Sequence, residues 1–300
     1  MKLGQIDLDA YLARAESVIL LPQASANAEA SAEAYAPSLR KAPVGELHVG
    51  VDLGTAYLVL VVLDDQGQPL AGEYQFAEVV RDGLVVDFIG ATDRLRAMKQ
   101  RVERRLGRPL RHAASGYPPG VPEVEMRAAA HVVEAAGLEC TRLVDEPSAA
   151  NALLRLDHGA IVDVGGGTTG IAIIDHGQVV YTADEPTGGV HFTLVIAGGL
   201  NIPFDEAEAL KTNPAEQSRL FPSIRPVMEK VGSIVSRHIA VYQSLDHGER
   251  HVDSLTLVGG ACAFQGMAGV IQEFTGIPTC VPGRPLFITP LGIALHDEVT

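Results

Sequence analysis

The stretch IVDVGGGTTG, residues 161–170, is the strongest indication of the fold in this chain. An apolar strand leads into Asp163, three glycines and two threonines follow, and a second apolar strand occupies residues 171–174. Glycine costs roughly 0.5–1 kcal/mol relative to alanine inside regular structure, so three in succession indicate a turn that has a use. We expect the backbone to bend sharply there and to bring its N–H groups close to an anion.

A second hairpin of the same kind is VGVDLGT, residues 49–55, which leads into the apolar run 58–63. An aspartate precedes each turn, Asp52 in this hairpin and Asp163 in the other. A carboxylate beside a phosphate is repulsive unless a cation lies between them, so both aspartates are candidates for holding hydrated Mg²⁺. Thr55 and Thr168 can donate hydroxyl hydrogens to phosphate oxygens. The duplication predicts two half-domains that face one bound phosphate chain.

The context of the glycine-rich hairpin argues against two simpler interpretations. Gly165, Gly167 and Gly170 match the dinucleotide fingerprint by letter, but that fingerprint must open a helix. Residues 171–181 instead predict strand, turn and strand. A purely structural hairpin needs only one or two turn residues such as Asn-Gly, and it does not need an aspartate before it twice.

The composition restricts the class of protein and its partners. The 300 residues, 47% of them hydrophobic, suffice for one large or two ordinary domains. A net charge of −14 makes nucleic acid and anionic membrane surfaces poor partners. Neither a transmembrane run nor a signal-peptide pattern is found. The three scattered cysteines indicate reduced thiols, so we expect a cytoplasmic protein.

Residues 1–45 differ from the body that follows. Apolar residues at helical spacing predict an amphipathic helix over residues 7–21, and the alanine-rich stretch 22–37 is typical of a linker or weak helix. The helix either packs on the body or serves as a detachable docking peptide for a partner. The sequence leaves both interpretations open.

The body alternates strands and helices, which argues for α/β layers. Outside the two hairpins, the sequence predicts strands over 74–80, 112–117, 141–144 and 255–258, and helices over 93–106, 123–136, 148–156, 264–274 and 289–295. The arginines between residues 101 and 111 are interpreted as a solvated helix face. His247 and His251 are four residues apart, but no third metal ligand can be assigned to them.

Five motifs, in order along the chain, resemble those of the actin/Hsp70/hexokinase ATPase superfamily. They are DLGT at residues 52–55, DEPSAA at 145–150, DVGGGTT at 163–169, LVGGA at 257–261 and TPLGIA at 289–294. They resemble, in turn, the first phosphate motif, the first connecting motif, the second phosphate motif, the adenosine motif and the second connecting motif.

More narrowly, the chain is similar to the EutJ family of ethanolamine-utilisation proteins over most of the body. The residues that carry this resemblance are 77–91, 117–120, 168–173 and 183–189. The segment VRDGLVVD, residues 80–87, also resembles the bacterial actin homologue MreB.

The resemblance implies an α/β actin-like ATPase fold, with two RNase H-like domains around a nucleotide cleft and a short N-terminal extension. We expect an amphipathic segment and linker over residues 1–45, domain I over 46–158 plus 287–300, and domain II over 159–286. The connecting motifs would form crossing helices at the hinge. Their small residues suit a close helix approach: Ala149, Ala150, Gly292 and Ala294.

The resemblance also implies site roles, with ATP or ADP and Mg²⁺ as the bound groups. Asp52 and Asp163 would hold Mg²⁺ through waters, and Glu146 would orient the attacking water. The β- and γ-phosphates would contact the turn residues Gly54, Thr55, Gly165, Gly166, Gly167, Thr168 and Thr169. The adenosine would contact Gly259, Gly260, Ala261, Glu208 and Lys211. The alternative for Glu208 and Lys211 is an exposed ion pair on a helix.

Two departures from the superfamily point to slow hydrolysis. Gly170 stands where Hsp70 proteins carry a further Mg²⁺-site aspartate, and residues 64–115 hold no convincing match to the Hsp70 catalytic lysine. We therefore expect at most a slow ATPase, in which the nucleotide acts as a switch.

EutJ-type proteins are described as chaperone-like and are associated with metabolic microcompartments. The resemblance thus implies an ATP-binding, weakly hydrolysing, chaperone-like accessory protein of an ethanolamine-type bacterial microcompartment. Its partner would be a protein client or a microcompartment enzyme or shell protein. One alternative is a nucleotide-gated filament or scaffold/adaptor protein of the MreB kind, capable of self-association. The other is a small-molecule kinase, for which the sequence offers no obvious acceptor-side base.

Overall fold

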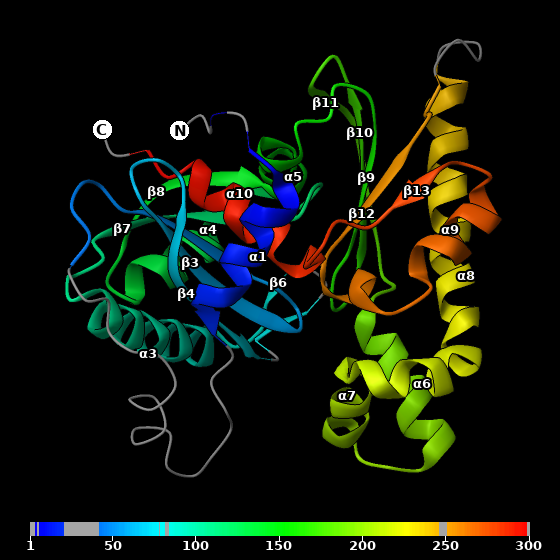
Figure 1. Cartoon of the computed structure of the whole chain (residues 1–300), viewed down its shortest axis with the longest axis horizontal. Helices are drawn as coiled ribbons and strands as arrows, with labels where there is room; N and C mark the ends of the chain where they lie inside the picture. The colour runs from blue at the N-terminus through cyan, green and yellow to red at the C-terminus, as the bar shows by residue number, and fades with distance from the viewer. Residues whose placement is uncertain are drawn as a thin grey trace. The chain divides into compact units, whose positions relative to one another are not determined.

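The computed structural model describes residues 4, 6–20, 42–77, 79–81, 84–245 and 251–298, and Figure 1 draws the chain. Two compact units are found. Unit 1 takes Met1–Tyr117, Val121–Leu154 and Phe287–Thr300, and unit 2 takes Pro118–Gly120 and Arg155–Leu286. The predicted linker at 22–37 and the residue His247 lie outside the described residues.

Unit 1 is built on a six-stranded sheet of order β1-β4-β3-β2-β7-β8. Strands β2 (His48–Leu53), β3 (Tyr57–Leu63) and β4 (Pro69–Phe76) form an antiparallel meander. Strands β7 (His112–Tyr117) and β8 (Glu139–Asp145) continue in parallel beside β2. The short β1 (Ile19–Leu20) pairs with β4, and β5 (Val80–Arg81) and β6 (Leu84–Val85) form a separate ribbon.

Helices cover both faces of this sheet. Alternate residues of β2 and β3, such as Val49, Val51 and Leu60, share a core with α3 (Phe88–Leu106) and α4 (Glu123–Ala135). On the other face lies α10 (Ile288–Leu295), where a Cβ at Gly50 would be 2.5 Å from the Pro290 carbonyl oxygen. Strand β3 is therefore apolar and buried along almost its whole length.

Unit 2 repeats the same plan in a five-stranded sheet of order β11-β10-β9-β12-β13. Strands β9 (Gly159–Val164), β10 (Thr169–Asp175) and β11 (Gln178–Glu185) form the antiparallel meander. Strands β12 (Leu255–Val258) and β13 (Thr279–Cys280) continue in parallel beside β9. The duplication predicted from the two glycine hairpins is confirmed in this topology.

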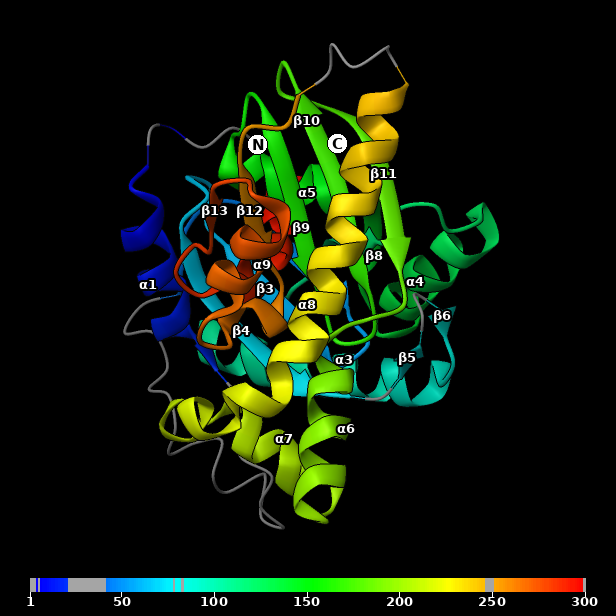
Figure 2. The same cartoon turned by 90° about the vertical axis from the view of Figure 1, so that its right-hand side faces the viewer.

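The helices of unit 2 are α6 (Gly189–Leu200), α7 (Phe204–Thr212), α8 (Pro214–Ser244) and α9 (Met267–Thr275), with short 3₁₀ turns η1 (Gly260–Ala263) and, at the border with unit 1, η2 (Pro285–Phe287). Figure 2 shows the long α8 lying along the sheet. The buried side chains Phe192, Met228 and Val235 of these helices pack with Val162 and Ile171 of the sheet.

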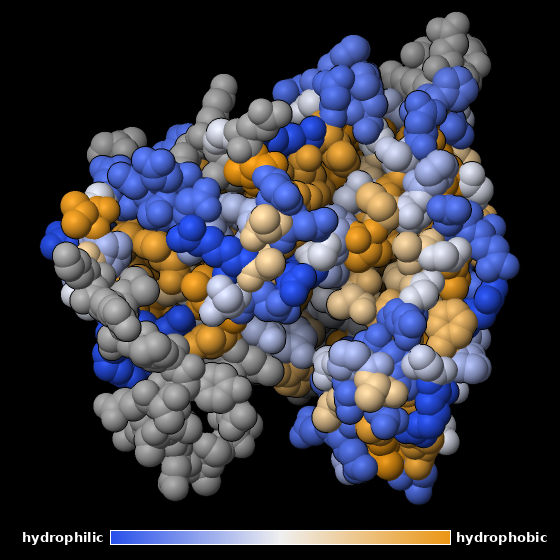
Figure 3. Space-filling model, viewed as in Figure 1, coloured by the Kyte–Doolittle hydropathy of each residue, from blue (hydrophilic) through white to orange (hydrophobic). Residues whose placement is uncertain are grey.

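The surface mixes apolar and hydrophilic side chains over the face drawn in Figure 3. The most exposed large apolar side chains of the described residues are Val44, Val124 and Ile89 of unit 1, at 91%, 77% and 72%. Among the described helices, none is both long enough and apolar enough to cross a membrane.

The predicted N-terminal helix is α1 (Leu8–Val18), and it packs on unit 1. The Asp7 side chain accepts a hydrogen bond from Ala10 N and so caps the helix start. The Tyr11 hydroxyl is buried and donates to the Gly67 carbonyl at 2.8 Å, and Arg14 Nε donates to the Pro69 carbonyl at 3.2 Å. Packing on the body is therefore the interpretation that the structure supports.

The predicted close helix crossing is present between α5 (Glu146–Leu154) and α10. A Cβ placed on Gly292 would lie only 1.8 Å from the Ala149 carbonyl oxygen. Because that oxygen belongs to the backbone of a packed helix, glycine is required at residue 292.

Several element boundaries differ from the prediction for local reasons. The strand expected at 74–80 is β4, which ends at Phe76, and the helix expected at 93–106 already begins at Phe88. It begins earlier because the Asp87 carboxylate accepts from Gly90 N at 2.8 Å and caps the first turn. The helix expected at 264–274 starts only at Met267, after the 3₁₀ turn η1.

The prediction of a solvated arginine face between residues 101 and 111 is wrong for three of its members. Arg101 pairs with the buried Glu73 carboxylate at 2.8 Å. Arg105 donates to the backbone carbonyls of Gly72 and Val18, and Arg108 donates to those of Pro43 and Gly45. Arg101 and Arg105 thus fasten β4 and the end of α1 to α3, and Arg108, just after α3, holds the start of the body.

Candidate functional site

The two glycine turns have the same geometry. Leu53 pairs with Leu58 and Val164 pairs with Thr169, so residues 54–57 and 165–168 form turns of equal length. In each, the first glycine N–H donates to the carbonyl three residues later, Gly54 to Tyr57 and Gly165 to Thr168, both at 3.1 Å. By this register Asp52 is equivalent to Asp163, whereas Thr168 matches Tyr57 rather than Thr55.

In unit 2 the start of α6 holds the carbonyl side of the turn. Gly189 N donates to the Gly165 carbonyl at 2.9 Å and Val190 N to the Gly166 carbonyl at 2.8 Å. This approach needs a glycine at residue 188, because a Cβ there would lie 2.6 Å from the Gly166 carbonyl oxygen. Gly188 and Gly189 belong to the predicted site, and sequence reasoning missed them; a glycine pair at a helix start was the available signal.

The amide side of the same turn differs from the carbonyl side. Within the part of the chain that the structure describes, the N–H groups of Gly166, Gly167 and Thr168 have no hydrogen-bond partner. These residues are also only partly buried. Successive free backbone donors in a turn form an anion-binding concavity, so the turn can receive phosphate oxygens.

The predicted adenosine motif lies against this turn. Val258 pairs with Asp163, and Gly259 follows at a φ of +88°. A Cβ on Gly259 would be 2.2 Å from Asp163 Oδ1, so only glycine allows the chain to pass the carboxylate. Ala261, in the turn begun by Gly260, comes close to Gly189, where a Cβ would lie 3.3 Å from the Ala261 Cβ. Unit 2 thus brings its predicted metal, phosphate and adenosine residues together.

Glu208 and Lys211 form an ion pair at 2.6 Å, but the pair is buried rather than exposed, with 11% of each side chain accessible. The Lys211 ammonium also donates to Thr193 Oγ1 at 3.0 Å and to the Gly189 carbonyl at 3.2 Å. Burial lowers the pKa of Lys211, and the Glu208 carboxylate opposes that shift. Since three ammonium hydrogens have three partners, Lys211 acts here by holding the start of α6 beside the glycine turn.

Thr169 does not fit its predicted phosphate role through its side chain. The residue is fully buried, and its hydroxyl donates to the Thr187 carbonyl at 2.6 Å. That hydrogen bond ties β10 to the segment just before α6. We therefore assign the Thr169 hydroxyl to the support of the turn.

The turn at residues 54–57 of unit 1 resembles the unit 2 turn in how its carbonyl and amide groups are used. The Ala56 carbonyl accepts from Ala77 N at 2.9 Å and the Tyr57 carbonyl accepts from Gly54 N. Among the described residues, no partner is found for the N–H groups of Thr55 and Ala56. The backbone of this turn can therefore also donate to an anion.

Glu146 lies at the same edge of the unit 1 sheet as Asp52. It directly follows β8, and the Asp145 carboxylate accepts from Ser148 N at 2.9 Å to fix this helix start. Strands β2, β7 and β8 are parallel, so their carboxyl ends meet at one edge, which is where polar sites form in α/β sheets. A Cβ on Gly116 of β7 would lie 3.6 Å from Glu146 Cγ.

Comparison with known proteins decides the family. Residues 123–285 match the family model described as type IV pilus assembly protein PilM. The ethanolamine utilization protein EutJ of Escherichia coli is 43% identical over 249 residues, which cover 83% of this chain and 85% of that protein. The chain belongs to the EutJ family. The crystal structure of EutJ from Carboxydothermus hydrogenoformans superposes with a TM-score of 0.83 at 42% identity, covering 96% of this chain and 98% of that one.

The EutJ-family fold is also found in a more distant protein. MreB5 of Spiroplasma citri, solved with AMPPNP, superposes with a TM-score of 0.65 at 17% identity, covering 85% of this chain and 97% of that one. This likeness concerns the fold alone. It confirms the predicted actin-like α/β fold.

Proposed function

We propose that this chain is an ATP-binding accessory protein of ethanolamine utilisation that hydrolyses ATP slowly. The observation that carries the proposal is the turn of unit 2. There, three successive amides that lack a hydrogen-bond partner among the described residues lie beside Asp163 and Gly259, just after β12. Membership of the EutJ family supports the ethanolamine assignment. The AMPPNP and ADP named with the two MreB5 structures support a nucleotide as the ligand.

The residues present fit an ATP molecule with its Mg²⁺. The amides of Gly166, Gly167 and Thr168, and of Thr55 in unit 1, would donate to phosphate oxygens. Asp52 and Asp163 supply the carboxylates that Mg²⁺ prefers, in each case immediately before a phosphate turn. The bound cation would neutralise phosphate charge. Gly259, Gly260 and Ala261 would let the adenosine approach the backbone, and Glu146 would hold a water for attack.

Asp184 joins this set as a residue that the sequence did not single out. Strand register places Asp163, Gly170 and Asp184 in one row across β9, β10 and β11, so all three positions share a face of the sheet. A Cβ on Gly170 would lie 3.6 Å from Asp184 Oδ1 and 3.9 Å from the Asp163 Cβ. Asp184 therefore offers a carboxylate above the position where Hsp70 proteins carry their additional aspartate, and we assign it to the Mg²⁺ shell.

Slow turnover, a chaperone-like role and a microcompartment partner belong to the same proposal. According to this proposal, nucleotide binding changes the affinity of the chain for a protein partner. The partner must therefore bind two conformations of the chain with different affinities. A pull-down with ethanolamine-utilisation enzymes and shell proteins, with and without Mg-ATP, tests this part. Equal recovery under both conditions would argue against a nucleotide switch.

An adaptor protein is the second candidate, motivated by the match of residues 123–285 to the type IV pilus assembly protein PilM, which is named with a PilM–PilN complex. Light scattering with and without Mg-ATP separates it from a filament. Growth of large species on addition of Mg-ATP would favour a filament of the MreB kind. A monomer or dimer that is unchanged by Mg-ATP would exclude a filament.

Thermal stabilisation tests nucleotide binding directly. Mg-ATP and Mg-ADP should raise the melting temperature in proportion to RT ln(1 + [L]/Kd), and Mg-GTP should do so less. Asp163→Asn keeps the shape of the side chain and removes its charge, so the Mg²⁺-dependent part of the stabilisation should disappear. Arg142→Gln, which removes an exposed pair with Glu298, serves as a control that leaves it unchanged.

A further inference from the structure

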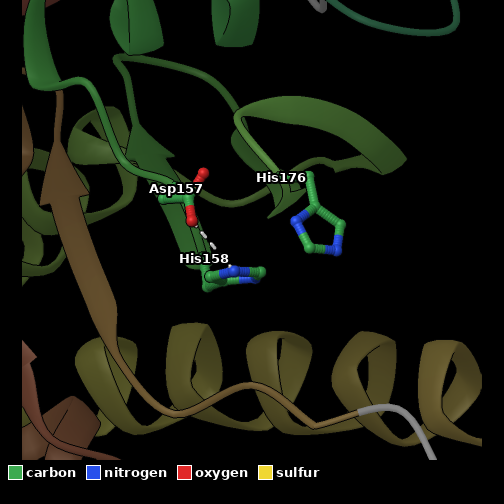
Figure 4. A group of neighbouring side chains, drawn as sticks. All are labelled: Asp157, His158 and His176. Atoms are coloured by element: carbon green, nitrogen blue, oxygen red, sulfur yellow. Dashed lines mark ion pairs between the residues drawn. The ribbon is translucent and has the colours of Figure 1, made fainter.

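Two histidines and two aspartates lie together at one end of unit 2, and none of the four takes part in the nucleotide proposal. Asp157 and His158 immediately precede β9, and His176 stands in the turn between β10 and β11, directly after Asp175. Figure 4 shows Asp157, His158 and His176 as neighbours. One ligand atom from each of these three lies within 4.8 Å of the other two, and all three residues are exposed to solvent.

The backbone holds this cluster on a rigid frame. The turn has His176 at a φ of +48° and Gly177 at +71°, values of a tight hairpin turn in which asparagine or glycine is the usual first residue. Gly177 N donates to the Asp157 carbonyl at 2.9 Å, and Ile174 pairs with Gly159. The two chain segments that carry the histidines are thus fastened to each other by the backbone. A non-glycine residue in this conformation is strained, and such residues cluster at functional sites.

The side chains show the pattern of an oriented metal ligand. His158 Nε2 lies 3.0 Å from Asp157 Oδ2, and His158 Nδ1 lies 2.9 Å from Asp175 Oδ1. A carboxylate on one ring nitrogen fixes the tautomer and aims the other nitrogen at a metal, as around metal-bound histidines in general. The His176 ring lies edge-to-face with His158, with centroids 4.9 Å apart.

We propose that Asp157, His158 and His176 bind one divalent transition-metal ion of the zinc class, with Asp175 orienting His158 from outside the coordination shell. The ligands would be an Asp157 carboxylate oxygen, His158 Nε2 and one ring nitrogen of His176. Imidazole and carboxylate together suit Zn²⁺, Ni²⁺ or Cu²⁺, whereas Mg²⁺ and Ca²⁺ take oxygen ligands. Metal–ligand distances of about 2.0–2.2 Å need only small rotations of these exposed side chains to bring the ligand atoms closer together.

Such an ion would clip the start of β9 to the β10–β11 turn. Three protein ligands leave a fourth position of a tetrahedral site to water or to another ligand. The site is separate from the Mg²⁺ position proposed at Asp163, since it uses residues beyond the opposite ends of β9 and β10.

Zinc titration of the full chain, nucleotide-free and in excess Mg²⁺, tests the site. We expect one equivalent of Zn²⁺ to bind. His158→Asn, His176→Asn and Asp157→Asn should each weaken it at least tenfold, and Asp175→Asn by about tenfold as an orienting residue. Asparagine is chosen at residue 176 because it tolerates the left-handed backbone. His131→Asn is the matched control, since it removes another exposed histidine–carboxylate pair, at 3.1 Å from Glu134.

Copper provides a readout that separates this cluster from the three cysteines. The electron paramagnetic resonance spectrum of the Cu²⁺-loaded protein should show coupling to two imidazole nitrogens, and each histidine variant should lose one. Circular dichroism of the metal-free variants verifies that they fold. The proposal is overturned if the His158→Asn/His176→Asn double variant binds Zn²⁺ as tightly as the unaltered chain, or if the unaltered chain binds none.

Discussion

Replacing Lys211 by methionine removes the cation from the buried pair that holds the start of α6. Glu208 is 9% exposed and lies 2.6 Å from the Lys211 ammonium, so the variant leaves a buried carboxylate without its charge partner. Loss of one member of a buried pair costs about 3–5 kcal/mol. We expect about 3 kcal/mol, because Thr193 Oγ1 still donates to Glu208 Oε2 at 2.5 Å.

The double variant Glu208→Gln/Lys211→Met should cost less than Lys211→Met alone, about 1 kcal/mol, since no unpaired charge remains. Arg219→Met is the matched control. This variant removes an ion pair with the same i, i+3 spacing, between Arg219 and Glu216 on α8. The Arg219 side chain is 56% exposed, and such surface pairs contribute less than about 1 kcal/mol to the free energy of unfolding.

Urea unfolding measures these differences. The chain has no tryptophan, so far-UV circular dichroism is the suitable probe. The same variants should weaken Mg-ATP binding, because Lys211 also holds the Gly189 carbonyl. If Lys211→Met costs no more than Arg219→Met, or if the double variant costs the sum of the two single changes, Glu208 and Lys211 are not coupled as a buried ion pair.

Three further predictions concern the helix crossing, the proposed Mg²⁺ shell and Glu185. Gly292→Ala should destabilise unit 1 by about 3 kcal/mol, because the added Cβ would meet the Ala149 carbonyl oxygen. A Cβ at Gly269 on α9 meets no atom within 4 Å, so Gly269→Ala should not destabilise the protein. Chemical unfolding compares the stabilities of the two variants. Asp184→Asn should raise the Kd for Mg-ATP several-fold and leave the Kd for metal-free ATP unchanged, as measured by calorimetry. An equal rise of both dissociation constants would exclude a role of Asp184 in binding Mg²⁺. The hydrogen bonds from Arg237 and His238 lower the pKa of Glu185 below its ordinary 4.5. The contribution of the Glu185 carboxylate to the free energy of unfolding is therefore fully present above pH 4.5. It is lost as the pH falls through the lower pKa that the group has in the folded protein. The melting temperature of Glu185→Gln should accordingly lie below that of the unaltered chain at neutral pH and converge with it in acid; a constant difference would contradict this.

The parts of the fold predicted from sequence are those with strong local signals. Glycine turns between apolar strands identified both hairpins, and helix α1 followed from apolar spacing alone. Helix α8 was missed because Pro222 and Pro226 lie inside it, and proline normally ends a helix. Its apolar face, with Met228, Val231 and Val235 buried, keeps the helix intact through tertiary packing.

The candidate site divides in the same way. The motif glycines and aspartates are visible in sequence because their chemistry is local to each turn. Asp184 became a candidate only through strand register, and burial of the Glu208–Lys211 pair depends on Thr193 and α6, which no spacing rule supplies. The same holds for His158 and His176, which meet only because β9 pairs with β10.

Hydrogen exchange at the two turns reports whether their backbone amides bind phosphate. With saturating Mg-ATP, the amides of residues 165–168 and 54–57 should both become protected, and AMP, which lacks the β- and γ-phosphates, should protect neither. If Mg-ATP leaves the exchange of both segments unchanged, whether or not it protects other segments, these turns do not bind the phosphates.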